Sequence, residues 1–105
     1  MQLLTPKLIE RFKEVGSQEN NKDPLFLAKF FNPTGIGNWF PTEYDPTTEI
    51  FFGYVSLFGD YNDEWGSFSL EELELYKGQL GLGIKRDIHF QETPSSIIIP
   101  QYTKS

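Results

Sequence analysis

Two carboxylates of this chain, Glu43 and Asp45, are spaced to act together, and Trp39 and Tyr44 lie beside them. Because residues two apart in a strand point to the same face of a sheet, both acids would face one side. Paired acids can carry out acid–base chemistry or hold Mg²⁺. They can equally pair with basic residues of neighbouring strands, or cap a turn that Asp45-Pro46 begins. We place the candidate binding patch here, on a strand whose edge a partner could extend.

A second group of oxygen-bearing side chains alternates along a polar loop. Asp60, Asn62 and Glu64 occupy alternate positions, and Glu71 lies where a calcium loop places its bidentate carboxylate. Trp65, however, occupies the position at which such a loop needs glycine, and the preceding segment is predicted to be a strand rather than a helix. The pattern therefore makes these four residues only weak candidates for metal ligands. We expect instead a polar turn followed by a helix, whose first-turn acids interact favourably with the helix dipole.

The only histidine, His89, follows Arg86 and Asp87 and could act as a general base. Its spacing is compatible with a Ser–His–Asp assembly, but no nucleophile elbow accompanies it, and a lone histidine in a short strand is more often a structural residue. The glycines at positions 78, 81 and 83 reverse the order of a dinucleotide fingerprint and follow a helix, so they indicate a helix end and turns. We therefore expect a protein that is not an enzyme and that has no cofactor.

Between Lys29 and Lys77 the chain has no Lys or Arg, but it carries many acids and most of its aromatic residues. Such a one-sign block is a candidate recognition surface, because local counter-charges do not cancel its field. The alternative is that the aromatic residues form the core and the acids line the solvated edge of a sheet. The nine acids are Glu43, Asp45, Glu49, Asp60, Asp63, Glu64, Glu71, Glu72 and Glu74.

Composition excludes several classes of protein. The chain has 105 residues, a net charge of −6 and no cysteine. This length predicts one domain, and the negative charge disfavours direct binding to nucleic acid. Without cysteine there is no disulfide and no thiolate site. Because no stretch resembles a signal peptide or a membrane span, we expect a cytoplasmic protein that does not bind a membrane.

Capping residues predict two helices. The first is expected after Thr5-Pro6, where a capping hydroxyl precedes a proline in the first turn, and it should end at Gly16. The second opens at Ser69 with a capping box and should end at Gly78.

Three longer segments read as strands, at residues 25–31, 38–44 and 49–58. Pro41 cannot donate to a ladder, so the second strand should be an edge strand or carry a bulge. The third is apolar on both faces, which predicts a central strand covered by a helix. A polar loop is expected at 59–67, a short strand at 88–90, and a strand or apolar arm within 95–105. The fold predicted for residues 1–105 is a single α+β domain, with a mainly antiparallel sheet of about four to five strands and two helices.

Motifs in this order resemble a bacterial domain-of-unknown-function family, number 2958, typical of plasmids, conjugative elements and phages. The resemblance runs from Leu3 to about Pro94 and implies a small cytosolic accessory protein of mobile DNA, without a known activity. Lys85 replaces an acid that the family usually carries before Arg-Asp. The motifs are Leu3-Leu4-Thr5-Pro6, Lys29-Phe30-Phe31, Trp39 with Thr42-Glu43-x-Asp45, Phe51-Phe52-Gly53-Tyr54-Val55, Gly66-Ser67-Phe68-Ser69-Leu70-x-Glu72-Leu73, Gly81-Leu82-x-Ile84-Lys85-Arg86-Asp87 and His89-Phe90.

Three functional hypotheses follow. The first is a non-catalytic interaction module that binds a protein partner of the host or the mobile element around Trp39, Glu43, Asp45 and Trp65. The second is an acidic nucleic-acid mimic with an anti-restriction or anti-defence role, which would need its carboxylates spaced like phosphates along one exposed ribbon. The third is a metal-dependent or acid–base enzyme, which would need Glu43, Asp45, Arg86, Asp87 and His89 to converge in one pocket.

Overall fold

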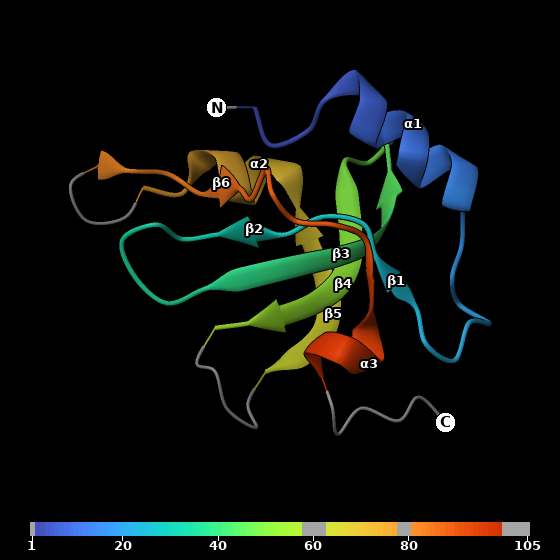
Figure 1. Ribbon diagram of the computed structural model, residues 1–105. Coiled ribbons are helices and arrows are strands. Elements are labelled where there is room, and N and C mark those ends of the chain that lie inside the picture. The colour runs from blue at the N-terminus through green and yellow to red at the C-terminus, as the bar shows by residue number, and fades with distance from the viewer. Residues whose placement is uncertain (1, 58–62, 78–80, 100–105) are drawn as a thin grey trace.

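A five-stranded antiparallel sheet organises the protein, in a computed structural model that describes residues 2–57, 63–77 and 81–99 (Figure 1). The strand order is β5-β4-β3-β2-β6, and β1 and β7 form a separate two-stranded ladder. The predicted α+β class and antiparallel sheet are confirmed, with one short helix more than expected. The elements are α1 (Pro6–Val15), β1 (Leu25–Phe26), β2 (Phe30–Phe31), β3 (Asn38–Asp45), β4 (Ile50–Ser56), β5 (Glu64–Ser69), α2 (Leu70–Leu75), β6 (Lys85–Arg86), β7 (Thr93–Pro94) and α3 (Ser95–Ile98).

The two predicted helix starts are confirmed by their caps. The Thr5 hydroxyl accepts a hydrogen bond from the Leu8 N–H, and Gly16 ends α1 with a φ of 67°. At α2, the Ser69 hydroxyl accepts from the Glu72 N–H at 2.9 Å. This helix ends at Leu75, before Gly78, which lies outside the described residues.

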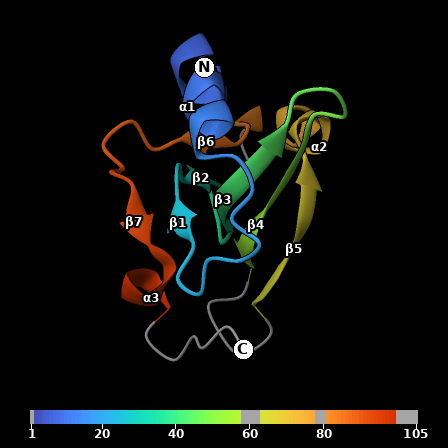
Figure 2. The ribbon, with the colours of Figure 1, turned by 90° about the vertical axis from the view of Figure 1, so that its right-hand side faces the viewer.

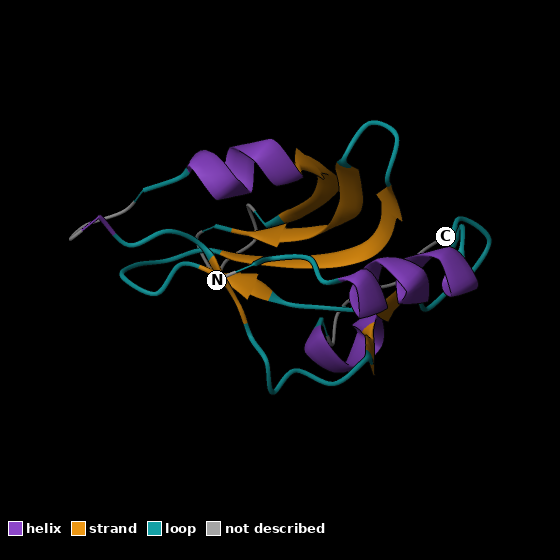
Figure 3. Ribbon diagram, turned by 90° about the horizontal axis from the view of Figure 1, so that it is seen from above, coloured by secondary structure: helices purple, strands orange, loops and turns teal. Residues whose placement is uncertain are grey.

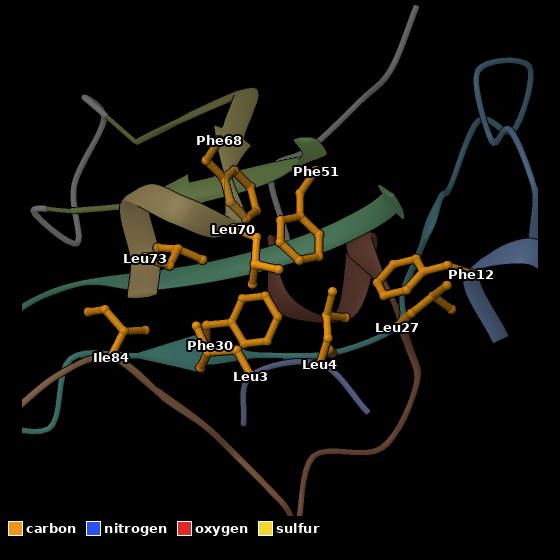
Figure 4. Close-up of a cluster of buried hydrophobic side chains, with 11 residues drawn as sticks. Leu3, Leu4, Phe12, Leu27, Phe30, Phe51, Phe68, Leu70, Leu73 and Ile84 are labelled. Carbon is orange, nitrogen blue, oxygen red and sulfur yellow. The ribbon is translucent and has the colours of Figure 1, made fainter. Parts of the chain in front are cut away.

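The sheet is covered on both faces. Figure 2 shows it between α2 on one side and the β1–β7 ladder with α3 on the other, and Figure 3 shows the same separation from above. On the α2 side, Phe30 and Phe51 are fully buried and their ring centroids lie 5.3 Å apart. Leucines from the N-terminal segment, α2 and the chain before β2 close this main core around them (Figure 4). The prediction that β4 is covered by a helix is therefore confirmed.

A second, aromatic cluster lies on the opposite face of the sheet. Phe26 from β1 is fully buried there. Its ring centroid lies 5.2 Å from that of Phe40 in β3 and 5.6 Å from that of Trp65 in β5. Phe90, in the segment before β7, contacts Phe40 at 6.1 Å. These contacts fasten the β1–β7 ladder to the sheet, because aromatic pairs at such distances add to the free energy gained by burial alone.

The β3 strand lies in the middle of the sheet, so the predicted edge strand is wrong and the predicted bulge is right. Its register with β4 shifts between Pro41 and Glu43. Since β2 is short, the other side of β3 is completed by the segment after α1. There the Leu27 N–H donates to the Pro41 carbonyl at 3.0 Å. This side of β3 is therefore already paired within the protein, so a strand of a partner cannot add to it.

Gln18 completes that edge with its side chain. It is 5 % exposed, and its Nε2 donates to the carbonyls of Leu25 and Thr42 at 2.9 and 2.8 Å. Its Oε1 accepts from the Leu25 N–H at 2.7 Å. One amide thus replaces the ladder bonds that a further strand would have made.

Four local predictions are wrong. The segment 25–31 does not form one strand, because β1 pairs with β7 whereas β2 pairs with β3 and β6. Residues 64–67 belong to β5 rather than to a loop, since they pair along β4. The short strand predicted at 88–90 lies instead at β6, and residues 88–89 form a turn. The apolar tail begins as the helix α3 rather than a strand, and residues 100–105 lie outside the described residues.

Candidate functional site

A hollow of about 540 Å³ lies between the end of α1 and the β3–β4 hairpin, and we call it the acidic hollow. It contains Glu43, Tyr44 and Asp45 of the predicted patch. The residues that line it are Phe12, Lys13, Gly16, Ser17, Glu43, Tyr44, Asp45, Pro46, Thr48, Ile50, Phe51, Phe52 and Ser67.

Aromatic residues of the main core help to line the acidic hollow. The Tyr44 ring lies 4.6 Å from that of Phe51 and 5.9 Å from that of Phe12, which α1 inserts into the main core. Burial raises the pKa of Tyr44, and the nearby carboxylates of Glu49, Glu74 and Asp45 raise it further. The Tyr44 hydroxyl thus lies near three carboxylates.

Backbone N–H groups hold the two acids of the pair. Glu43 and Asp45 pair with Phe52 and Ile50 of β4, so they share a face, as predicted. Glu43 Oε2 accepts from the Gln18 N–H at 3.1 Å. Asp45 Oδ1 accepts from the Thr47 N–H at 2.9 Å, which is the turn cap that the sequence left open as an alternative. The carboxylates are thus positioned while their charges remain at the rim.

Glu49 fixes the turn that carries these acids. Its backbone is in the left-handed region, with a φ of 59°. Its N–H donates to the Asp45 carbonyl at 2.7 Å, and its own carbonyl accepts from the Leu70 N–H at 3.0 Å. The second bond satisfies a donor in the first turn of α2, where helices lack internal acceptors. This strained residue therefore ties the acidic turn to the helix that carries Glu71, Glu72 and Glu74.

Partly exposed aromatic residues continue the patch along the same face of the sheet. Phe52 is 41 % exposed, and its ring is stacked 6.0 Å from that of Trp65. Tyr54 meets Trp65 edge to face at 5.7 Å. Trp39 is separated from this group, because it packs against the main core on the opposite face. The predicted patch therefore keeps Trp65 with Glu43 and Asp45, and loses Trp39.

The calcium pattern is not supported by the described part of the chain. Asp60 and Asn62 lie outside the described residues. Glu64 begins β5, and Glu71 lies in α2 beyond the other end of that six-residue strand. A strand of this length spans about 17 Å, which separates two ligands of one ion too far. Within residues 2–57, 63–77 and 81–99, no group of His, Cys, Asp or Glu is arranged to hold a metal ion.

Arg86, Asp87 and His89 lie away from the acid pair and line a different hollow. The Arg86 guanidinium donates to the carbonyls of Gln2 and Leu3 at 2.7 and 3.1 Å, which holds the N-terminal segment. Asp87 Oδ1 accepts from the His89 N–H at 2.9 Å and so caps a turn. The convergence required for the enzyme hypothesis is therefore not found among these five residues.

The acids fall into two groups at opposite ends of β4. One group surrounds the β3–β4 turn and α2, and the other lies at the start of β5, where the Ser56 hydroxyl donates to Asp63 at 2.8 Å. The seven-residue strand between them spans about 20 Å. The described acids thus lie in two separate groups, and Asp60 lies outside the described residues.

Sequence reasoning missed Gln18, Lys13 and the exposure of Phe52. Gln18 sits in a polar loop that carries no signal for a buried amide, and only the open side of β3 gives it a role. Phe52 sits in an apolar run in which Phe51 is buried and Phe52 is half-exposed. The alternation of residues along β4 predicted which side chains share a face. It did not predict which face is left partly exposed.

Fold and site together define a small α+β domain whose candidate site is a hollow lined by acidic and aromatic residues. Residues 3–103 match the family described as protein of unknown function DUF2958, and the chain belongs to this family. The match runs past Pro94, where the motif resemblance ended. No curated protein and no solved structure matches the chain. Across the described residues, every helix is too short or too polar to cross a membrane.

Proposed function

We propose that this protein is a small cytosolic accessory protein of a mobile genetic element and acts as a non-catalytic protein-interaction module. Its partner is a protein of the host or of the element, and the acidic hollow receives a basic segment of that partner. The mobile-element setting rests on the resemblance of its motifs to a family typical of plasmids, conjugative elements and phages.

The observation that carries the proposal is the position of Phe52. It is exposed on the face that also holds Glu43 and Asp45, and it lines the acidic hollow with them. A Lys or Arg side chain entering the hollow would meet carboxylates at the rim and aromatic faces within. Cations bind aromatic faces as well as carboxylates, and more strongly where water is displaced.

The charge around the hollow selects the same kind of partner. Lys13 is the one basic residue that lines it, opposite two acids, and the carboxylates of Glu49 and Glu74 are close enough to raise the pKa of Tyr44. A field of one sign speeds the approach of an oppositely charged partner and repels one of like charge. The separation of the acid pair from His89 supports binding rather than catalysis.

Binding of a short fluorescein-labelled peptide of alternating Arg and Tyr tests the proposal by fluorescence anisotropy. Asp45→Asn keeps a turn-capping oxygen but removes the charge, and Phe52→Ser removes the exposed ring. We expect each substitution to weaken binding by about fivefold to tenfold, a change of about 1–1.4 kcal/mol. Glu10→Gln on α1 is the matched control, because it removes the same charge from an exposed site that does not line the hollow.

Equal weakening by Asp45→Asn and Glu10→Gln would show attraction to net charge alone and would contradict the proposal. Unchanged binding of the peptide by Phe52→Ser would also contradict the proposal. Capture from a host extract then identifies the partner, which must be retained by the wild type and by Glu10→Gln but released by Asp45→Asn with Phe52→Ser.

A further inference from the structure

A second hollow, of about 340 Å³, lies at the edge of the sheet where β6 pairs with β2, and we call it the basic hollow. Figure 1 shows β6 beside β2 at this edge. The residues that line it are Lys29, Phe31, Lys85, Arg86, Asp87, Ile88 and His89. It shares no lining residue with the acidic hollow, so the two sites are independent.

The strand register brings two lysines to one face of this edge. Phe31 lies directly opposite Lys85 in the antiparallel pair. The Asp87 N–H donates to the Lys29 carbonyl at 2.9 Å, which continues the pairing by one further step. Since side chains alternate along each strand, Lys29 and Lys85 stand on the same face, on either side of Phe31. Diagonal neighbours of this kind are about 7–8 Å apart at the backbone, so both ammonium groups can reach one anion.

The charge of the basic hollow opposes that of the whole molecule. Lys29 and Lys85 outnumber the one carboxylate that lines it, Asp87, in a protein with a net charge of −6. Arg86 pairs with the buried Phe30 and donates to the Gln2 and Leu3 carbonyls, so its side chain lies on the other face from the two lysines. Asp87 is turned toward the backbone, where it accepts from the His89 N–H. The two lysines therefore leave this hollow with a net positive charge.

The hollow also offers apolar surface. Phe31 is half-buried between the lysines, and Ile88 is 64 % exposed in the turn after β6. Its volume is at the lower end of the range for small-molecule sites. A bare anion would leave this surface without a partner, whereas an anion attached to an apolar group would cover it.

We propose that the basic hollow binds a small organic phosphate monoester. Lys29 and Lys85 supply the positive field for the phosphate, and Phe31 and Ile88 contact the aromatic or aliphatic group attached to it. A phosphate monoester carries close to two negative charges at neutral pH, which suits two lysines beside one hollow. Lysine binds phosphate as a point charge, so the ligand's exact orientation need not be fixed by a planar fork.

Protection of a sheet edge accounts for part of this arrangement. Lysine on an edge strand discourages pairing with other chains, and β6 is an edge strand. This role explains Lys85 but not Lys29, which precedes β2. The Lys29 ammonium lies 6.0 Å from the centroid of the Phe40 ring, a cation–π contact that keeps it on this face. Ligand binding predicts that substituting the lysines weakens phosphate binding, whereas edge protection does not. An experiment can therefore separate the two explanations.

Amide chemical shifts measured by NMR during titration with phenyl phosphate test the proposal. We expect saturable shifts at residues 29–31 and 85–89, with a dissociation constant about tenfold below that for inorganic phosphate. Lys29→Gln and Lys85→Gln should each weaken binding by about fivefold or more. Lys22→Gln is the matched control, because Lys22 is exposed in the loop after α1 and lines neither hollow.

The proposal is overturned if no shift saturates by about 10 mM phenyl phosphate, well above the constants of ordinary metabolite sites. It is also overturned if inorganic phosphate binds as tightly, or if Lys22→Gln weakens binding as much as Lys85→Gln does. Aggregation of Lys85→Gln with unchanged phenyl phosphate binding would assign the lysine to edge protection instead. Thermal melting of each variant verifies that it is folded.

Discussion

Gly53 lies directly opposite Pro41 in the β3–β4 ladder, and the two backbones approach more closely than any side chain would permit. A Cβ added at Gly53 would lie 2.1 Å from the Phe40 carbonyl oxygen and 2.7 Å from the Pro41 Cα. Proline has no N–H to donate at this point, and the register shifts immediately after it. Glycine in β4 therefore permits the bulge in β3 that presents Glu43 and Asp45 to the acidic hollow.

We predict that Gly53→Ala lowers the free energy of unfolding by about 3 kcal/mol, because backbone atoms rather than a flexible side chain must move. Gly66→Ala is the matched control. Gly66 pairs with Gly53 on the other side of β4, yet a Cβ there meets nothing within 4 Å. The free energy of unfolding of Gly66→Ala should therefore differ from that of the wild type by less than about 1 kcal/mol. Urea denaturation measures both, and similar losses in the two variants would contradict the close approach.

Gln18→Leu keeps the approximate volume of the side chain but removes its hydrogen bonds. The carbonyls of Leu25 and Thr42 and the Leu25 N–H would then lose their partner in a buried position. We expect a loss of about 2 kcal/mol in the free energy of unfolding. Asn20→Ala, in the same loop and exposed, should change it by less than about 0.5 kcal/mol. Hydrogen exchange should also quicken at Leu25 and Leu27, and unchanged exchange would show that the amide does not hold this edge.

Asp23 gives stability a dependence on pH. Hydrogen bonds from the Ser96 hydroxyl and N–H, with a further one from Ser95, lower the pKa of Asp23 in the folded protein. Because the folded pKa lies below the unfolded value of about 3.9, this stabilisation is present above that pH and is lost as the pH falls through the folded pKa.

The melting temperature of Asp23→Asn should therefore lie below that of the wild type at pH 7 and approach it as the pH is lowered below about 4. Melting followed by circular dichroism at each pH measures the difference between the two proteins. Glu10→Gln serves as the control for removing an exposed carboxylate. A difference that is the same at neutral and at acid pH would show that the charged form of Asp23 is not the one that α3 stabilises.

Glu49→Gly should raise stability, which is unusual for a substitution to glycine. Glycine adopts a φ of 59° without the steric cost that a side chain brings, so we expect a gain of about 0.5–1 kcal/mol. Glu71→Gly removes the same kind of side chain from α2, where glycine is unfavourable, and should cost about 1 kcal/mol. A loss in both variants would show that the Glu49 side chain contributes more than its backbone conformation costs.

Local signals in the sequence predicted the elements that depend on neighbouring residues. The caps at Thr5 and Ser69 were identified because a cap is a contact across three residues, which spacing alone specifies. The shared face of Glu43 and Asp45 followed from the alternation of a strand, and this relationship survived the bulge that precedes them. The α+β class and the antiparallel sheet followed from the order of such elements.

Contacts between distant segments decided the rest. Nothing near Leu25 indicates that β1 pairs with β7 while β2 joins the main sheet, because both choices satisfy the same apolar run. Trp39 and Trp65 were predicted to share one surface, yet packing assigns one to the main core and the other to the aromatic face. The sequence alone therefore determined which residues are acidic, aromatic and locally capped. Tertiary packing decided which of them share a face, since that depends on how segments far apart in the chain cover one sheet.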